Sequence, residues 1–309
     1  MRGSPALHAS GEFHMSSSKN KEVRKYKKKS LWGETWSRLK RSKLAMAGLA
    51  LLVLLIILAC SADLIYDYET QGIAADYGNA LKWPSAAHFL GTDEMGRDVL
   101  ARLIYGSRIS LQVSIAATVT ALAIGGLLGA VAGYYGGRTD NTIMRIMDVF
   151  LAIPNLLLAI AVVASLGPSM LNLMLAIAIA DIPKFARIVR AAVLGVKDQE
   201  FVEAAKACGA PNLRIIMREI IPNCLAPIIV QGSITIAASI LVIASMSFIG
   251  LGVTPPTPEW GSMLAGGRTY IRDYNYLTVF PGVAIALTSL SINLLGDGLR
   301  DALDPKLKR

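Results

Sequence analysis

The sequence predicts an all-α membrane protein with six transmembrane helices, and three observations support this prediction. The chain has 309 residues, of which 53% are hydrophobic and 17% are charged, a balance outside that of ordinary soluble domains. Long uncharged segments alternate with short charged ones. The Lys and Arg residues behind the net charge of +9 gather at the N-terminus, between residues 184 and 218, and at the C-terminus. This distribution is typical of cytoplasmic loops and does not indicate a nucleic-acid-binding face.

The N-terminal region precedes the first apolar segment. Residues 1–14 (MRGSPALHASGEFH) show no periodicity and are interpreted as a leader added for expression, with the native start at Met15. Residues 15–43 form a basic tail that we expect to be cytoplasmic, because no signal peptide follows Met15. Trp32 and Trp36 lie four residues apart among basic residues, which favours a helix on the membrane surface. An ordinary cytosolic extension of the first span is the alternative.

Apolar segments locate the transmembrane helices, since about 20 apolar residues cross a bilayer as a helix. Four segments fit one span each, at residues 44–66, 110–134, 223–248 and 276–296. A fifth segment, 149–180, carries no charge but is too long for one helix and is interrupted by Gly167-Pro168-Ser169. We therefore predict two spans there, the first starting near Thr142 and the second continuing past Asp181.

The positive-inside rule tests this count. Six crossings place the N-terminal tail, the segment 184–222 and a C-terminal tail at 299–309 on the cytoplasmic side. The outer side then holds an extracytoplasmic loop and helix at 67–108. Helices 2–6 form a core transmembrane domain at 109–298.

Charges inside spans mark proton or ion pathways in transporters that work alone. The candidates are all predicted at cytosolic span ends, and they are Arg145, Asp148, Asp181 and Lys184. Asp181 and Lys184 lie three residues apart and are expected to pair. The sequence therefore disfavours an ion-coupled secondary transporter or channel.

Small residues in the second span indicate how the helices pack. Gly125, Gly129 and Gly133 follow one another at four-residue spacing. Such residues let helices approach closely in a membrane. We predict tight helix packing here, with a pore-lining role as the alternative.

Motifs for catalysis and metal binding are missing from the sequence. Cys60, Cys208 and Cys224 are scattered without a C-x-x-C pair, and His88 is the one histidine outside the leader. A metal centre built by this chain is therefore not expected. The phosphate-binding loop G-x-x-x-x-G-K-[ST], the G-x-S-x-G motif and the H-E-x-x-H motif are absent. We expect no ATP hydrolysis by this chain, and an intramembrane enzyme is disfavoured.

A charged helix-turn-helix, EAAKACGAPNLRIIMREIIP at residues 203–222, lies between the fourth and fifth spans. Phe201, Ala205 and Cys208 fall on one side of its first helix, and Gly209 is placed to end that helix. Pro211 suits the first turn of a second helix. The predicted apolar stripe of that helix comprises Leu213, Ile216, Met217, Ile220 and Ile221. The pattern leaves two interpretations, a helix pair lying on the membrane surface or a docking element for a cytosolic partner.

Two further motifs lie on the predicted outer side. In GTDEMGRD (91–98), Thr92 or Asp93 is expected to cap an outer helix, and Asp98 to pair with Arg102. A structural role is favoured, with contact to a solute-binding protein as the alternative. In TPPTPEWG (254–261), the prolines predict a stiff outer turn, and Trp260 suits the membrane interface. We interpret this turn as mainly architectural or as part of an outer gate.

Together these motifs resemble those of the dipeptide, oligopeptide and nickel permease family of ABC importers, specifically its second, C-type permease subunit. The resemblance rests on three stretches: Glu203-Ala204-Ala205 with Gly209 and Ile220-Ile221-Pro222; GTDEMGRDVLARLIYGSRISL at 91–111; and SFIGLGVTPPTPEWGSML at 247–264. It runs from about Trp32 to Lys306. Ile221 stands where many relatives carry Leu, which keeps an apolar anchor.

The resemblance implies a type I ABC importer permease fold and roles for particular residues. The loop at 199–222 would couple to an ATPase through Glu203, Ala204, Ala205, Lys206, Gly209 and Pro211. The extracytoplasmic motif would comprise Gly91, Thr92, Asp93, Gly96, Arg97 and Asp98. The outer gate or turn would comprise Pro255, Pro256, Pro258 and Trp260.

The same resemblance implies partners and a location. A homologous permease would form a heterodimer with this chain, joined by two ATPase subunits and an extracytoplasmic solute-binding protein. ATP and Mg²⁺ would be bound by the ATPases and no cofactor by this chain. The expected location is the bacterial or archaeal cell (inner) membrane, among its lipids, with both termini cytoplasmic. The expected cargo is a dipeptide or oligopeptide, with nickel, glutathione or another small solute as the alternative.

Overall fold

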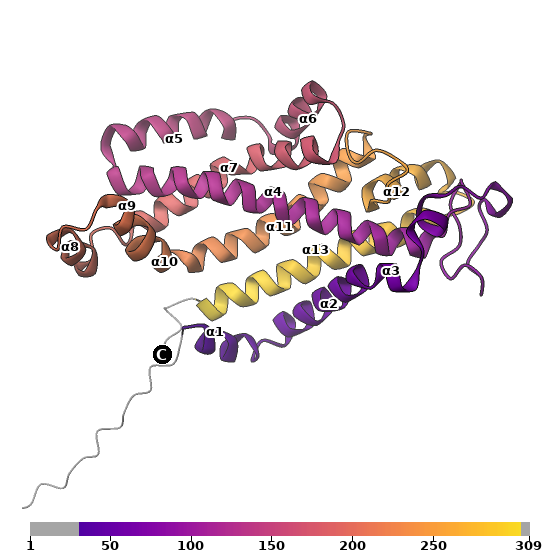
Figure 1. Ribbon diagram of the computed structural model, residues 1–309, viewed down its shortest axis with the longest axis horizontal. Coiled ribbons are helices and arrows are strands. Elements are labelled where there is room, and N and C mark those ends of the chain that lie inside the picture. The colour runs from indigo at the N-terminus through magenta and orange to yellow at the C-terminus, as the bar shows by residue number, and fades with distance from the viewer. Residues whose placement is uncertain (1–30, 304–309) are drawn as a thin grey trace, which may run out of the picture.

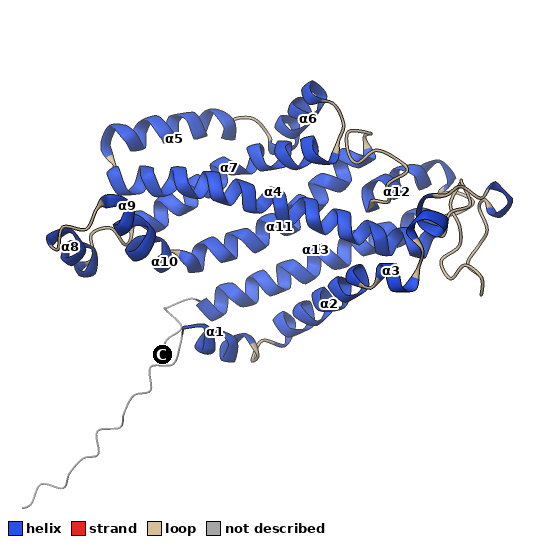
Figure 2. Cartoon of the chain, viewed as in Figure 1, coloured by secondary structure: helices blue, strands red, loops and turns tan. Residues whose placement is uncertain are grey.

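The computed structural model describes residues 31–303, and the regular elements in this range are all helical (Figure 2). The interpreted leader, most of the basic tail and the last six residues lie outside the described part. In chain order the elements are α1 (Leu31–Leu39), α2 (Lys43–Cys60), α3 (Ala62–Ile65), η1 (Tyr68–Ile73), η2 (Tyr77–Asn79), α4 (Val99–Tyr135), α5 (Gly137–Leu151), α6 (Asn155–Leu166), α7 (Met170–Leu194), α8 (Glu200–Ala207), α9 (Asn212–Arg214), η3 (Ile215–Ile220), α10 (Ile221–Asn223), α11 (Leu225–Phe248), α12 (Trp260–Gly267), η4 (Arg268–Tyr270) and α13 (Tyr276–Leu303). The short elements η1 and η3 are π-helical.

Several of these helices are long and apolar enough to cross a membrane. Within the described residues they are α2, α4, α11 and α13, and the bent pair of α5 and α6 makes a fifth crossing if it counts as one span. Helix α7 has 25 residues but carries Asp181, Lys184 and Arg187. The all-helical class is confirmed, whereas six crossings are reached only if α7 also crosses with these charges.

The third predicted span starts earlier and is bent. Helix α5 begins at Gly137, ahead of Thr142, and α6 leaves it at an angle of 85°. Pro154 accounts for the break, because proline has no N–H to donate and disfavours a helical residue before it. Arg145 and Asp148 therefore lie in the second half of α5, and the prediction that they begin the span is wrong.

The second predicted span also differs from the structure, because it is continuous with the predicted outer helix. Helix α4 runs over 37 residues, and the side chain of Asp98 caps it by accepting a hydrogen bond from the N–H of Ala101 at 3.0 Å. The prediction that Thr92 or Asp93 caps this helix is wrong.

The predicted pair of Asp181 and Lys184 is present, with Nζ to Oδ1 at 2.6 Å. Asn155 of α6 also donates to the Asp181 carboxylate, at 2.8 Å. Asp181 lies near the middle of α7 and is 4% exposed, so its predicted place at a span end is wrong. Buried charges require such partners, and the hydrogen bond from Asn155 joins α6 to α7.

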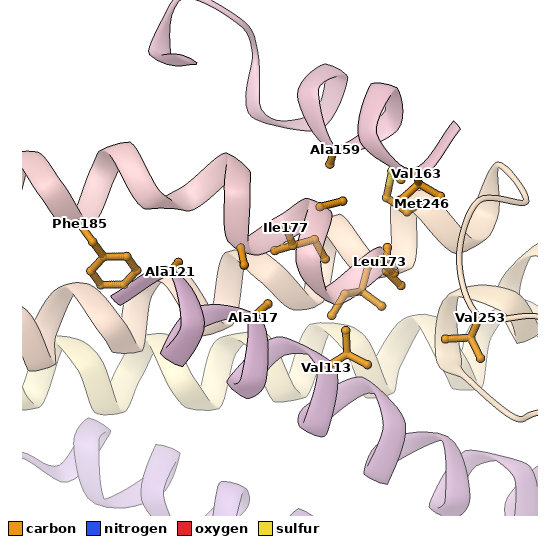
Figure 3. Close-up of a cluster of buried hydrophobic side chains, with 13 residues drawn as sticks. Val113, Ala117, Ala121, Ala159, Val163, Leu173, Ile177, Phe185, Met246 and Val253 are labelled. Carbon is orange, nitrogen blue, oxygen red and sulfur yellow. The ribbon is translucent and has the colours of Figure 1, made fainter. Parts of the chain in front are cut away.

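Helices α4 and α7 approach each other more closely than side chains would allow. A Cβ atom at Gly129 would lie 2.3 Å from the backbone oxygen of Ala186, and one at Gly125 would lie 2.4 Å from that of Ile182. The predicted tight packing is therefore confirmed. An apolar cluster surrounds part of this contact (Figure 3), with members Val113, Ala117, Ala121, Leu173, Ala176, Ile177 and Phe185.

The two ends of the molecule carry different elements (Figure 1). Helices α8 to α10, the turn between α4 and α5, α1 and the C-terminal end of α13 lie at one end. The segment before α4 and helix α12 lie at the opposite end. The segments predicted to share the cytoplasmic side therefore share one end of the structure.

We expect Gly129→Ala to destabilise the protein, because the new methyl group must push α4 away from α7. Overpacking of this kind costs about 1–3 kcal/mol. Gly126→Ala is the matched control, since its Cβ would lie 3.6 Å from the nearest side-chain atom, an ordinary contact. Thermal unfolding of the purified protein measures the difference. Equal melting temperatures for both variants would refute the close α4–α7 contact.

Candidate functional site

The helix-turn-helix at residues 203–222 forms a projecting unit at one end of the molecule (Figure 1). Helix α8 attaches through Val202, which is fully buried, and through the partly buried Phe201 and Ala205. These residues join an apolar cluster with residues of α4, α7 and η3. Cys208, predicted on the same side, is exposed, so that part of the prediction is wrong and the attached side is centred on Val202.

The opposite side of α8 faces away from the spans. Glu203, Ala204 and Lys206 are exposed, and the Glu203 carboxylate has no hydrogen bond or ion pair within the described part of the chain. Lys206 Nζ lies 5.7 Å from the ring centroid of Tyr134, at the end of α4. The Tyr134 hydroxyl donates to Asn212 Oδ1 at 2.9 Å. The unit is thus fixed to α4 while a free carboxylate and a small side chain point to solvent.

The turn after α8 depends on glycine. Gly209 has a φ of +74°, a conformation that other residues adopt only with strain. Its N–H donates to Lys206 O at 2.9 Å, and the N–H of Ala210 donates to Ala205 O at 3.1 Å. The prediction that Gly209 ends the helix is confirmed. Pro211 precedes the next helix as its N-cap, one position before the predicted first turn.

The second helix of the unit is not a regular α-helix. Residues Ile215–Ile220 form a π-helical turn, in which hydrogen bonds join residues five apart. Ile215, Ile216 and Ile220 are buried, whereas Leu213 is 69% and Met217 52% exposed. The predicted stripe assumed a 3.6-residue period, which the wider turn does not keep, so its placement of Leu213 and Met217 is wrong. An open surface hollow is lined by Pro211, Leu213, Arg214, Met217 and Arg218.

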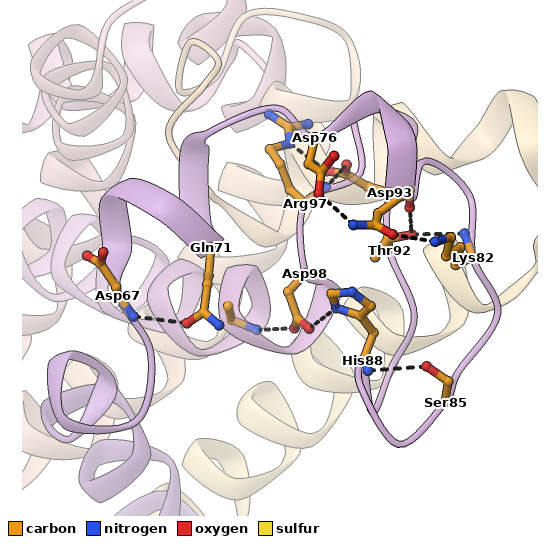
Figure 4. A network of polar contacts seen from close by, with 12 residues as sticks. Asp67, Gln71, Asp76, Lys82, Ser85, His88, Thr92, Asp93, Arg97 and Asp98 are labelled. Carbon is orange, nitrogen blue, oxygen red and sulfur yellow. Dashed lines mark hydrogen bonds and ion pairs between the residues drawn. The ribbon is translucent and has the colours of Figure 1, made fainter.

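At the other end of the molecule, Asp93 is the centre of the GTDEMGRD motif (Figure 4). Its Oδ2 accepts a hydrogen bond from Arg97 Nε at 2.7 Å and lies 3.4 Å from Arg102 Nε. Its Oδ1 accepts from the backbone N–H groups of Met95 and Arg97, both at 2.9 Å. All three charged side chains are less than a tenth exposed. Because buried charges are stable only when paired, Asp93 holds this loop together.

The other residues of the motif shape the loop. Gly96 has a φ of +79°, and a Cβ atom there would lie 1.7 Å from Asp76 O, so only glycine fits. Thr92 Oγ1 accepts from the N–H of Lys82 at 2.8 Å and donates to Asn79 O at 2.5 Å. Gly91, at the start of the motif, donates its N–H to His88 O at 2.9 Å.

Asp98 and Arg102 do not pair as predicted. Besides capping α4, the Asp98 carboxylate contacts His88 Nδ1 at 2.9 Å (Figure 4). Arg102 instead donates to the backbone oxygens of Gly72 at 2.8 Å and Pro256 at 3.2 Å. The predicted pair is therefore wrong, because the cap geometry directs Asp98 back to its own helix end. The bond to Pro256 joins the two outer motifs.

The outer turn is anchored by Glu259, which the sequence analysis missed. This side chain is 1% exposed and accepts from the N–H groups of Gly261 at 2.8 Å and Ser262 at 2.9 Å, capping α12. It also accepts from Ser110 Oγ of α4 at 3.3 Å. Burial raises the pKa of the Glu259 carboxyl above its usual range. An acidic residue directly before an apolar helix is a capping signal that the neighbouring prolines hid.

The other residues of the turn divide between surface and core. Pro255 and Pro256 are exposed, whereas Pro258 is buried. Trp260 is 1% exposed, and its Nε1 donates to Leu103 O of α4 at 2.9 Å. The prediction that Trp260 lies at the membrane interface is wrong, because the indole is enclosed by protein.

These features define a class of protein. Helices of membrane-spanning length carry an exposed loop that is fixed to two of them, which is the architecture of a helical membrane protein with a projecting loop. Residues 125–309 match the model of the binding-protein-dependent transport system inner membrane component, and residues 30–84 match the N-terminal transmembrane domain of oligopeptide transport permease C. The chain belongs to this family of ABC importer permeases.

Relatives and solved structures agree with this assignment. The chain is 47% identical over 277 residues to the dipeptide transport system permease protein DppC of Alkalihalophilus pseudofirmus, covering 90% of both chains. It is 46% identical over 277 residues to the glutathione transport system permease protein GsiD of Escherichia coli O157:H7, covering 90% of this chain and 91% of that one. A chain of the inward-facing MetNI methionine ABC transporter has the same fold, with a TM-score of 0.54 at 19% identity, covering 66% of this chain and 96% of that one.

We expect Asp93→Asn to destabilise the protein strongly, since it leaves two buried arginines without their shared carboxylate. Breaking a buried ion pair in this way costs on the order of 3–5 kcal/mol. Asp273→Asn is the control, because Asp273 is exposed. Thermal unfolding of the purified variants is the measurement. A melting temperature for Asp93→Asn equal to that of the control would contradict the central role of Asp93.

Proposed function

We propose that this chain is the non-catalytic permease subunit of an importer for dipeptides or oligopeptides, forming the translocation path with a homologous permease. The exposed face of α8 carries the proposal most directly, because its Glu203 carboxylate has no partner within the described chain while the opposite side is fixed to the spans. An ABC importer permease without a phosphate-binding loop would receive its energy from ATPase subunits. The names of its relatives support a peptide as the cargo.

The geometry suggests how force passes from the ATPases to the spans. Glu203, Ala204 and Lys206 would enter a cleft of one ATPase subunit, since alanine keeps this side of α8 slim. Val202 and the Tyr134 hydroxyl tie α8 and the following turn to α4 and α7. Closure of two ATPase subunits on ATP would then move these helices and alternate access to the path.

The proposal includes partners, cofactors and orientation. The two ATPase subunits bind ATP and Mg²⁺, this chain binds no cofactor, and a solute-binding protein delivers cargo from outside. The chain lies in the inner membrane of a bacterial or archaeal cell with both termini cytoplasmic. The orientation rests on the Lys and Arg residues of the N-terminal tail and of the segment 184–222.

Glutathione is a second candidate cargo, because relatives named as glutathione permeases are 46% identical to this chain. Reconstitution of the complex with its binding protein separates the candidates. The ATPase activity stimulated by dipeptides, oligopeptides, glutathione or nickel ions would be compared. Stimulation by nickel alone would overturn the peptide proposal.

We expect Glu203→Lys and Gly209→Pro to uncouple transport without preventing membrane insertion. Reversing a charge in a docked interface costs several kcal/mol, so uptake should fall at least about tenfold. Proline at 209 removes the N–H that bonds to Lys206 O and cannot adopt the positive φ. Asp198→Lys, a charge reversal just before α8, is the control. ATP-driven uptake in proteoliposomes is the measurement, and full uptake by both variants would disprove the coupling role.

We expect Lys206→Cys, in a variant whose native cysteines are replaced by serine, to react with a membrane-impermeant thiol reagent only from the cytosolic side. Asp273 is exposed and lies between η4 and α13, outside the candidate membrane spans. A variant with Asp273→Cys as its single cysteine serves as the control and should react from outside. Labelling of position 206 in sealed cells would overturn the proposed orientation.

A further inference from the structure

A cavity of about 460 Å³ lies between the two outer motifs. Its walls come from the segment 93–102, from residues 247–255 at and after the end of α11, and from the region of α12 and η4. Cavities of about 300–1,000 Å³ are the usual size of small-molecule sites. The helix-turn-helix unit at residues 203–222 lies at the opposite end of the molecule (Figure 1). The cavity is therefore separate from the proposed ATPase contact.

The cavity is lined by one acidic and one basic side chain, Glu94 and Arg268, that make few polar contacts within the described residues. Glu94 is 28% exposed and has one long contact, to Arg97 Nη2 at 3.4 Å. Arg268 is exposed, has its guanidinium 5.3 Å from the ring centroid of Phe248, and forms no ion pair within the described residues. A Cβ atom at Gly266 would lie 3.6 Å from Glu94 Oε1. The Glu94 carboxylate therefore reaches the stretch of chain that carries Arg268.

The buried charged side chains of the cavity wall already pair with one another. Asp93 is bound by Arg97 and lies 3.4 Å from Arg102, and both arginines are about 5% exposed. This buried set holds the wall that carries Glu94 in place. The groups left for a ligand are one carboxylate and one guanidinium.

The cavity wall also contains backbone donors without acceptors. Gly252 and Val253 line the cavity and are buried, yet their N–H groups have no hydrogen-bond partner among the described residues. Buried backbone N–H groups are almost always paired in native proteins. These two adjacent donors are therefore available to a hydrogen-bond acceptor that enters the cavity.

We propose that this cavity is a subsite for the zwitterionic backbone of a short peptide. Arg268 binds the peptide carboxylate, Glu94 binds the peptide ammonium group, and the N–H groups of Gly252 and Val253 donate to peptide carbonyl oxygens. The inference rests on the proposed peptide cargo. It places recognition of the cargo in the permease itself, in addition to any selection by a binding protein.

An acidic side chain of the solute-binding protein is the competing occupant. Such a side chain would use the guanidinium of Arg268 alone and would leave the Glu94 carboxylate as a repulsive neighbour. A free peptide satisfies both charges and the backbone donors together. The observations therefore favour the peptide.

The test uses the complete complex with its partner permease and ATPases, in lipid nanodiscs and without the binding protein. The probes are alanyl-alanine, its N-acetyl form and its C-terminal amide. Direct binding of each probe is measured by calorimetry. Loss of one charge-assisted hydrogen bond weakens binding about tenfold or more.

We expect Arg268→Gln to weaken alanyl-alanine binding by this factor and to bind the C-terminal amide as the unaltered complex does. Glu94→Gln should give the same pattern with the N-acetyl form. Arg268→Lys keeps the charge and should restore most of the affinity, whereas Arg272→Gln, an exposed neighbour outside the cavity, should change nothing. Each variant should bind the probe that lacks the matching charge as tightly as the unaltered complex does. This result for both variants would establish the two contacts.

Three results would overturn the inference. They are no binding by the unaltered complex, equal losses for Arg268→Gln and Arg272→Gln, or weakened docking of the binding protein with unchanged peptide binding. If peptides are still transported in any of these cases, the proposed function stands and only the subsite falls. If the complex transports no peptide but another solute, the proposed function fails first.

Discussion

The contact of α4 with α7 through glycine is the constraint on which the rest of the structure depends. At Gly125 and Gly129 the two backbones meet without intervening side chains, so neither helix can shift without the other. Helix α7 is followed by the helix-turn-helix unit at residues 203–222, and α4 begins at the outer motif through its Asp98 cap. The contact between these two helices therefore connects the outer motif with the unit that we propose docks to an ATPase.

The two ends are built by different physical means. At the end that carries α8 and η3, apolar side chains such as Val202 and Ile215 pack these two elements against the spans. The polar face of α8 stays exposed. At the outer end, buried charged side chains and helix caps hold the loops in place. Asp93 and Glu259 each accept several hydrogen bonds there. Apolar contacts hold the exposed surface of α8, which we propose docks to a partner, whereas directional hydrogen bonds fix the outer loop that lines a cavity.

The sequence was sufficient to predict features that depend on local pattern or composition. Tight packing at Gly125 and Gly129 followed from their spacing, and the end of α8 at Gly209 followed from the needs of its turn. The buried face of η3 could not be predicted, because a π-helical turn changes the period that pattern analysis assumes. The distant partners of Arg102 and Glu259 were also missed, since they depend on segments brought together only by folding.

The length of α4 has a mechanical consequence. A helix of 37 residues extends about 55 Å at 1.5 Å per residue, whereas a bilayer with its headgroups is about 40–45 Å thick. A rod of this length spans the whole bilayer at tilts of up to about 35°. One continuous helix therefore joins the outer motif at Asp98 to Tyr134, which holds the loop that we propose as the ATPase contact. In the proposed mechanism, a displacement at either end is carried along this single helix.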